Sequence, residues 1–109
     1  MKYLSIVAIV LSLSAFSAHA GELFGTISEG TKPVSEGVKV EVNAGDKTYS
    51  AETDKFGSYR VFVKEKGKCT LKVHFKEQTP SFSVSSFEKS TRYDFVLELK
   101  DGKYTLGRK

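Results

Sequence analysis

The stretch VKVEVNAGDKTYSAET, residues 38–53, decides the fold class. In its first half three valines alternate with Lys39 and Glu41, so one face of an extended segment is apolar and the other is charged. Residues 43–46 (NAGD) are turn formers, and residues 47–53 return with a second alternating pattern. This period of two predicts a β-hairpin with one buried and one solvated face.

The same alternation recurs on both sides of this hairpin, and no segment after residue 22 carries a helical period. Seven runs are expected to be strands: 23–28, 38–42, 47–53, 58–63, 69–75, the serine-rich run with Phe82 and Val84, and 91–99. Turn-forming residues separate these runs at intervals of roughly eight to twelve residues, which is typical of a sandwich. We therefore predict an all-β protein, a seven-stranded antiparallel β-sandwich of the Ig-like kind.

The N-terminus has the layout of a secretory signal peptide. Lys2 supplies the positive charge, residues 4–16 form an apolar run, and Ala18-His19-Ala20 provides the small residues of a cleavage site. An uncleaved anchor is the alternative, but the run is too short to span roughly 30 Å of hydrocarbon. We expect a signal peptide over 1–20, no membrane span after its cleavage, and a periplasmic or secreted protein.

The expected domain organisation after the signal peptide is one sandwich over residues 21–100, followed by a basic tail over 101–109. Two states of the tail are open. It is either disordered, as short charged termini often are, or it extends an edge strand through Tyr104 and Leu106.

The chain resembles the carboxypeptidase regulatory-like domains, which are transthyretin-like sandwiches. The resemblance rests on Gly25-Thr26-Ile27, on a Pro-containing turn at 32–34, on the valine strand at 38–42, and on the motif TDKFGSY at 53–59. Cys69 departs from the pattern, because such domains usually carry an aromatic residue there. The resemblance implies a free-standing, non-catalytic accessory or interaction domain.

Catalytic chemistry is not expected. Cys69 and His74 are five residues apart on one predicted strand, so their side chains point to opposite faces and cannot form a dyad. His74 is the one histidine after the predicted cleavage site, too few for a zinc site, and Asp46, Glu52 and Asp54 are too scattered for a calcium site. We expect no catalytic residue, no metal and no cofactor.

Cys69 itself has two interpretations. The first is a small buried hydrophobe on the inward face of its strand. The second is an exposed thiol that pairs with another chain in an oxidising compartment.

The candidate binding surface is a basic patch with one aromatic residue. If residues 64–68 form a hairpin loop that pairs 58–63 with 69–75, then Arg60 lies opposite Lys72, with Phe62 and His74 beside them. An ordinary solvated face is the alternative.

The formal net charge of +4 is spread along the chain, which argues against a nucleic-acid binder. The expected function is protein interaction or envelope assembly, with another envelope protein as partner. The alternative is a carbohydrate-binding module with a glycan as ligand.

Overall fold

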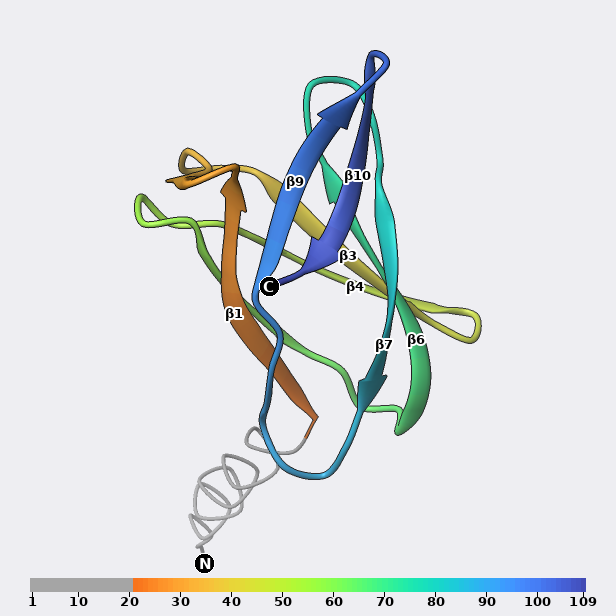
Figure 1. Ribbon diagram of the computed structural model, residues 1–109. Coiled ribbons are helices and arrows are strands. Elements are labelled where there is room, and N and C mark those ends of the chain that lie inside the picture. The colour runs from red at the N-terminus through yellow and green to blue at the C-terminus, as the bar shows by residue number, and fades with distance from the viewer. Residues whose placement is uncertain (1–20) are drawn as a thin grey trace, which may run out of the picture.

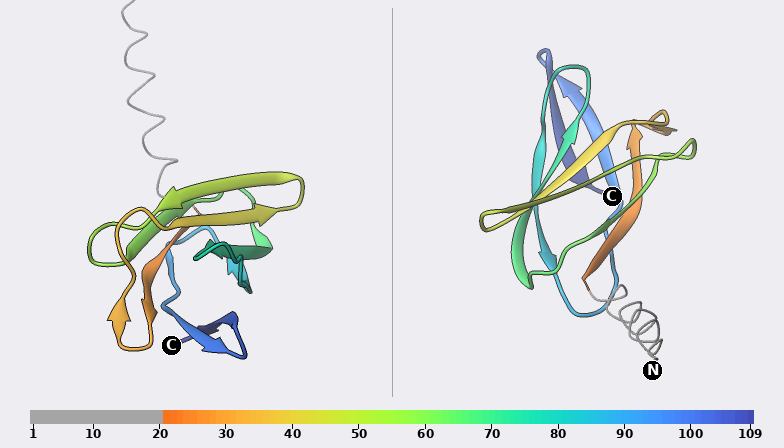
Figure 2. Two further views of the ribbon diagram at one scale, coloured as in Figure 1. Left: turned by 90° about the horizontal axis from the view of Figure 1, so that it is seen from above. Right: turned by 180° about the vertical axis from the view of Figure 1, so that it is seen from behind.

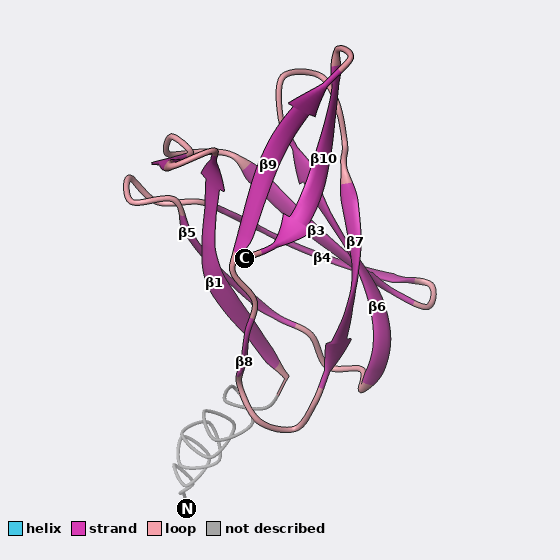
Figure 3. Cartoon of the chain, in the orientation of Figure 1, coloured by secondary structure: helices cyan, strands magenta, loops and turns pink. Residues whose placement is uncertain are grey.

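The computed structural model describes residues 21–109, and the predicted signal peptide lies outside these residues. Within them the chain consists of strands and loops, as Figure 3 shows. The strands are β1 (Glu22–Glu29), β2 (Lys32–Pro33), β3 (Lys39–Ala44), β4 (Lys47–Glu52), β5 (Ser58–Phe62), β6 (Gly67–His74), β7 (Ser81–Ser86), β8 (Thr91–Arg92), β9 (Phe95–Lys100) and β10 (Lys103–Arg108). In this part of the chain no helix is long and apolar enough to cross a membrane.

The strands form two sheets that pack as a sandwich, which confirms the predicted fold class. The first sheet has the order β10-β9-β1-β2, and β5 and β8 also pair with β1; the second has the order β4-β3-β6-β7. Figure 1 shows β1 and β9 side by side in the first sheet, and Figure 2 shows the β3–β4 and β9–β10 hairpins in different layers.

The two-residue alternation places one apolar face of each sheet in the core. Fully buried side chains come from both sheets: Leu23, Ile27, Val61, Phe95 and Leu97 from the first, and Val40, Val42, Leu71, Val73 and Val84 from the second. Burying each such side chain contributes roughly 1.5–3 kcal/mol. At the centre, the ring of Phe95 meets that of Phe82 from the facing sheet, with ring centroids 5.3 Å apart.

Two hairpin turns are as expected from their residues. Gly45 and Asp46 join β3 to β4 with Gly45 at φ 65°, and β3 extends two residues further toward the turn than the 43–46 loop predicted from the sequence. Asp101 and Gly102, at φ 52° and 79°, join β9 to β10.

The C-terminal segment is a strand, which decides between the two states left open for 101–109. β10 pairs antiparallel with β9 from Lys103 to Arg108, and Leu106 is buried opposite Leu97. The sandwich therefore continues beyond residue 100, where the sequence placed its end, because an apolar side chain in the tail completes the core.

Three details differ from the predicted seven antiparallel strands. The run 91–99 is interrupted after Arg92 and forms β8 and β9. Both of these strands pair with β1 in parallel. The predicted pairing of 58–63 with 69–75 is wrong: β5 pairs with β1 in the first sheet, and β6 pairs with β3 and β7 in the second. Residues 63–66 cross from one sheet to the other, so proximity in sequence did not lead to pairing.

Candidate functional site

The residues of the predicted basic patch do not lie together. Arg60 and Phe62 are exposed on β5 of the first sheet, where they alternate with buried residues. Lys72 and His74 alternate with buried residues on β6 of the second sheet. Because each pair points away from the shared core, the two pairs lie on opposite outer faces of the sandwich.

A cleft of about 460 Å³ lies on the outer face of the first sheet instead. We call it the arginine cleft. Phe24 and Thr26 of β1, Ser58 and Arg60 of β5, and Arg92 of β8 line it, together with Glu52 and Asp54 from the end of β4 and the following turn.

Two arginines flank one aromatic ring in this cleft. In the sheet register, Arg60 lies opposite Phe24 on one side and Arg92 lies opposite Phe24 on the other. The guanidinium carbon of Arg92 is 5.7 Å from the centre of the Phe24 ring, within the range of a cation–π interaction. The arrangement follows from β1 being the central strand, which places a neighbour on each side of Phe24.

Both arginines are held by carboxylates. Arg60 Nε lies 2.7 Å from Glu22 Oε2, and only 14% of the Glu22 side chain is exposed. Arg92 Nε donates to Asp94 Oδ2 at 2.9 Å. This interaction raises the pKa of Arg92 and lowers the pKa of Asp94, so the pair stays charged at neutral pH. Each guanidinium group therefore has a carboxylate partner that orients it toward the cleft.

Asp94 also connects the cleft to the sheet beneath it. Its Oδ1 accepts hydrogen bonds from the backbone N–H of Thr26 at 2.9 Å and from the Thr26 hydroxyl at 3.2 Å. The chain passes very close to β1 here, because a Cβ atom on Gly25 would lie 2.0 Å from the carbonyl oxygen of Tyr93. Glycine is thus required at this position on steric grounds.

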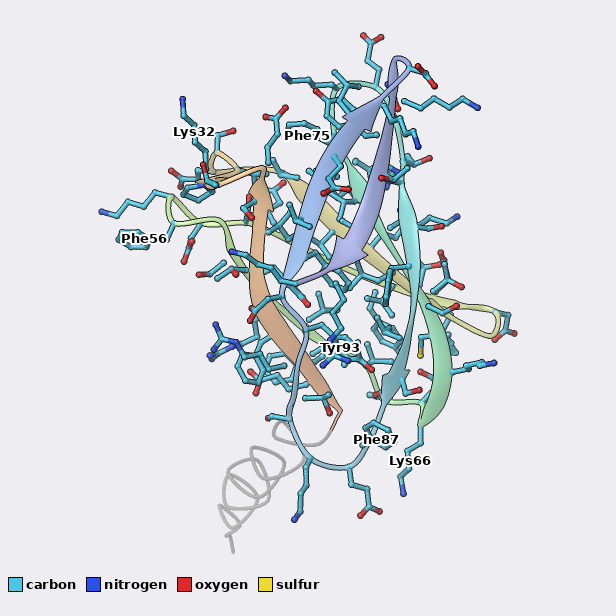
Figure 4. All side chains as sticks on the ribbon, in the orientation of Figure 1. Lys32, Phe56, Lys66, Phe75, Phe87 and Tyr93 are labelled. Carbon is cyan, nitrogen blue, oxygen red and sulfur yellow. The ribbon has the colours of Figure 1, made fainter. Side chains whose placement is uncertain are left out.

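Buried tyrosines support the same segment from inside. The Tyr59 hydroxyl donates to the carbonyl of Tyr93 at 2.7 Å, and burial raises the pKa of Tyr59. The Tyr93 hydroxyl in turn accepts the backbone N–H of Ser85 at 3.0 Å, across to the second sheet. Figure 4 shows Tyr93 between β9 and β7. The third arginine, Arg108, lies 4.5 Å from the centre of the Tyr93 ring and donates to the carbonyl of Arg92.

All three arginines of the protein therefore lie at or beside this cleft. Phe62, 46% exposed, extends the aromatic surface, since its position opposite Glu22 on β5 is diagonal to Phe24. Two other exposed aromatics, Phe56 at the left of Figure 4 and Phe87 near its bottom, do not line the cleft.

The sequence interpretation missed Phe24 and Arg92. Phe24 was detectable by the signal that singled out Phe62, because each is an apolar residue on the polar face of its strand. Nothing in the local sequence marks Arg92, which reaches the cleft through the parallel pairing of β8 with β1.

Cys69 and His74 lie on opposite faces of β6, as the sequence predicted. Cys69 is 5% exposed and faces the core, whereas His74 faces outward with Nε2 2.8 Å from Glu41 Oε1. Burial raises the pKa of the Cys69 thiol, and the hydrogen bond with His74 lowers the pKa of Glu41. The structure therefore favours the buried interpretation of Cys69 over the exposed intermolecular thiol. Among residues 21–109, no three His, Cys, Asp or Glu side chains are grouped to hold a metal ion.

No protein-family model and no curated protein matches the sequence. Two solved structures with a related backbone are a 9R-lipoxygenase from Cyanothece PCC8801 and a "putative cell adhesion protein" from Bacteroides ovatus ATCC 8483. For the lipoxygenase the TM-score is 0.47 at 11% identity, covering 84% of this chain and 20% of that one. For the second the TM-score is 0.40 at 10% identity, covering 84% and 44%. The chain spans less than half of either structure, and the likeness is too low to bear on function.

Proposed function

We propose that this protein is a non-catalytic, extracytoplasmic β-sandwich module of the carboxypeptidase regulatory-like type that binds another envelope protein through the arginine cleft. The signal-peptide pattern supports an extracytoplasmic site of action, and the motif at 53–59 supports the family. The sequence analysis found no group of residues that would be expected to catalyse a reaction, and we therefore propose binding as the mode of action.

The observation that carries the proposal is the concentration of arginine and aromatic side chains at one place. The protein uses lysine for most of its positive charge, yet its three arginines gather around Phe24 and Tyr93. Arginine and aromatic residues are enriched at the energetic centres of protein interfaces, and lysine is depleted there. Ion pairs with Glu22 and Asp94 orient Arg60 and Arg92, and such orientation lowers the entropy lost when a partner docks.

A second candidate function is carbohydrate binding. Phe24 and Phe62 lie on one outer face as diagonal neighbours, and sugar rings stack on exposed aromatic side chains. Glu52, Asp54 and the two arginines would supply hydrogen-bonding groups for hydroxyls.

The test uses the purified protein as bait on a native envelope extract, with retained proteins and glycans identified by mass spectrometry. Arg60→Gln removes one cleft charge, and Lys72→Gln makes the matched change on the opposite outer face. We expect a protein that is retained by the wild type and by Lys72→Gln but lost with Arg60→Gln. Equal retention by both variants would contradict the proposed site.

Retention of polysaccharide without protein would support the carbohydrate-binding alternative. In that case Phe62→Ala should abolish retention, because it removes half of the aromatic surface while leaving both arginines in place. Far-UV circular dichroism of each variant ensures that the comparison is between folded proteins.

A further inference from the structure

One end of the sandwich carries more lysine than acidic residues. The segments 63–68 and 87–90 meet there, because Gly67 at the start of β6 pairs with Ser86 at the end of β7. We call these two segments the lysine end. Its charged residues are four exposed lysines and two glutamates: Lys64, Lys66, Lys68, Lys89, Glu65 and Glu88. The turns 76–77 and 101–102, at the top of Figure 1, hold one lysine and two acidic residues instead.

Both glutamates of the lysine end are already bonded within the chain. Lys66 Nζ lies 2.5 Å from Glu88 Oε2, and the Tyr49 hydroxyl donates to Glu65 Oε1 at 2.6 Å. Each contact lowers the pKa of its carboxyl group. Among residues 21–109, the other three lysines of this end form no ion pair. These three ammonium groups are therefore available to an anionic partner.

An exposed aromatic ring lies among these lysines. A hollow of about 640 Å³ is lined by Phe87 together with Lys66 and Lys89, and Phe87 is 53% exposed. Figure 4 shows Phe87 and Lys66 close together near the bottom of the molecule. An apolar ring that enters the headgroup region, while neighbouring lysines contact anionic headgroups, is a general means of binding a membrane surface.

The predicted signal peptide joins the described chain at this same end. Gly21 is buried there, since its carbonyl accepts the Val63 N–H at 2.9 Å and its N–H donates to the Glu88 carbonyl at 3.4 Å. The apolar run 4–16 precedes Gly21 closely in the sequence. Because the apolar run of a signal peptide enters the membrane during export, its attachment at Gly21 brings the lysine end next to a bilayer.

We propose that the lysine end docks on the surface of an anionic lipid bilayer, with the Phe87 ring in the headgroup region. The excess of lysine favours an anionic surface, and the place where the apolar run is attached favours a membrane over a second protein. The proposal does not depend on the arginine cleft, because Arg60 and Arg92 lie outside both segments.

Vesicle binding is the first test. Residues 21–109 supply both sheets and the core, so the protein beginning at Gly21 is used, without the apolar run. We expect it to sediment with phosphatidylcholine vesicles that contain about one third phosphatidylglycerol and not with phosphatidylcholine alone. Lys64→Gln combined with Lys89→Gln keeps the Lys66–Glu88 ion pair and should weaken binding roughly tenfold or more.

Lys32→Gln combined with Lys55→Gln is the matched control. It removes the same charge from two exposed lysines outside the lysine end and should leave vesicle binding unchanged. Equal weakening by the two double variants would overturn the proposal, and so would a wild type that does not bind anionic vesicles. An envelope protein retained by such a wild type, but lost with the first double variant, would show that this end docks a protein instead.

Tryptophan fluorescence tests the orientation. The chain contains no tryptophan, so a single introduced residue reports its own surroundings. With anionic vesicles, emission from Phe87→Trp should shift to shorter wavelength and be quenched by brominated lipid. Phe56→Trp, at a side chain 65% exposed in the turn before β5, should show neither change. An unresponsive Phe87→Trp, or equal responses of the two variants, would contradict the proposed orientation and leave the cleft hypothesis untouched.

Discussion

The carboxylate of Asp94 takes the place of a strand carbonyl for Thr26: Asp94 Oδ1 accepts the Thr26 backbone N–H at 2.9 Å. Asp94 lies between the end of β8 and the start of β9, the two strands that pair with β1 on the same side. Its side chain therefore supplies a hydrogen bond to β1 where neither strand does. The same carboxylate orients Arg92 in the arginine cleft. Stability and the geometry of the candidate site therefore depend on one side chain.

Replacing Asp94 by Asn should lower the free energy of unfolding by about 1–3 kcal/mol. A charge-assisted acceptor for Thr26 and the ion pair with Arg92 are both lost. Urea denaturation measures the change. Asp46→Asn, in the β3–β4 turn, is the control and should stay within about 0.5 kcal/mol of the wild type.

The pH dependence of stability should report the same carboxylate. The folded protein holds the pKa of Asp94 below its ordinary value of 3.8, first through Arg92 and then through Thr26. Its stabilising contribution is therefore complete above about pH 5 and is lost as the pH falls through the folded-state pKa. The stability difference between wild type and Asp94→Asn should shrink below pH 3.8 in urea titrations. A difference that stays constant down to acid unfolding would contradict this role.

Gly25→Ala should destabilise the protein by at least about 2 kcal/mol, because the new methyl group meets the Tyr93 carbonyl in backbone that cannot move independently. Gly107→Ala is the matched control. A Cβ atom there would have its nearest neighbour at 3.9 Å, from a Val96 methyl group. Thermal unfolding of the two variants should show a large loss for the first and little change for the second.

Tyr59→Phe should cost about 1–2 kcal/mol, because it leaves the carbonyl of Tyr93 without its buried donor. Tyr104→Phe removes a hydroxyl that reaches Glu29 in a half-buried position and should cost less than about 1 kcal/mol. Chemical denaturation of both variants tests the ranking. An equal decrease in the free energy of unfolding for both variants would show that the Tyr59 hydrogen bond stabilises the protein no more than the Tyr104 hydrogen bond does.

Cys69 should react slowly with a thiol reagent in the folded protein. It is 5% exposed and its pKa is raised, so both access and thiolate formation are restricted. We expect labelling about a hundredfold slower than in urea-unfolded protein, where the thiol is free. Rapid labelling of the native state would instead restore the exposed-thiol interpretation.

The sequence by itself determined where the main strands lie and which of their side chains face inward, although not β2, the break between β8 and β9, or the choice of a strand for the tail. The alternation at 38–42 and at 69–75 is sufficient to predict which residues are buried. Alternate side chains of a strand lie on opposite faces, and the apolar face is the one that packs in the core. For the same reason it placed Cys69 and His74 on opposite faces of β6. It also marked Phe62 as an exposed aromatic.

Only the tertiary structure decided which strands are neighbours. Alternation specifies the face of a strand and says nothing about its partner, so β5 was expected beside β6 although it pairs with β1. The arginine cleft depends on that partner choice, because Arg60 and Arg92 reach Phe24 from strands more than thirty residues apart in sequence. Backbone hydrogen bonds are alike in every strand. The choice among partners therefore falls to the packing of the two sheets, to the steric allowance at Gly25 and to the carboxylate of Asp94.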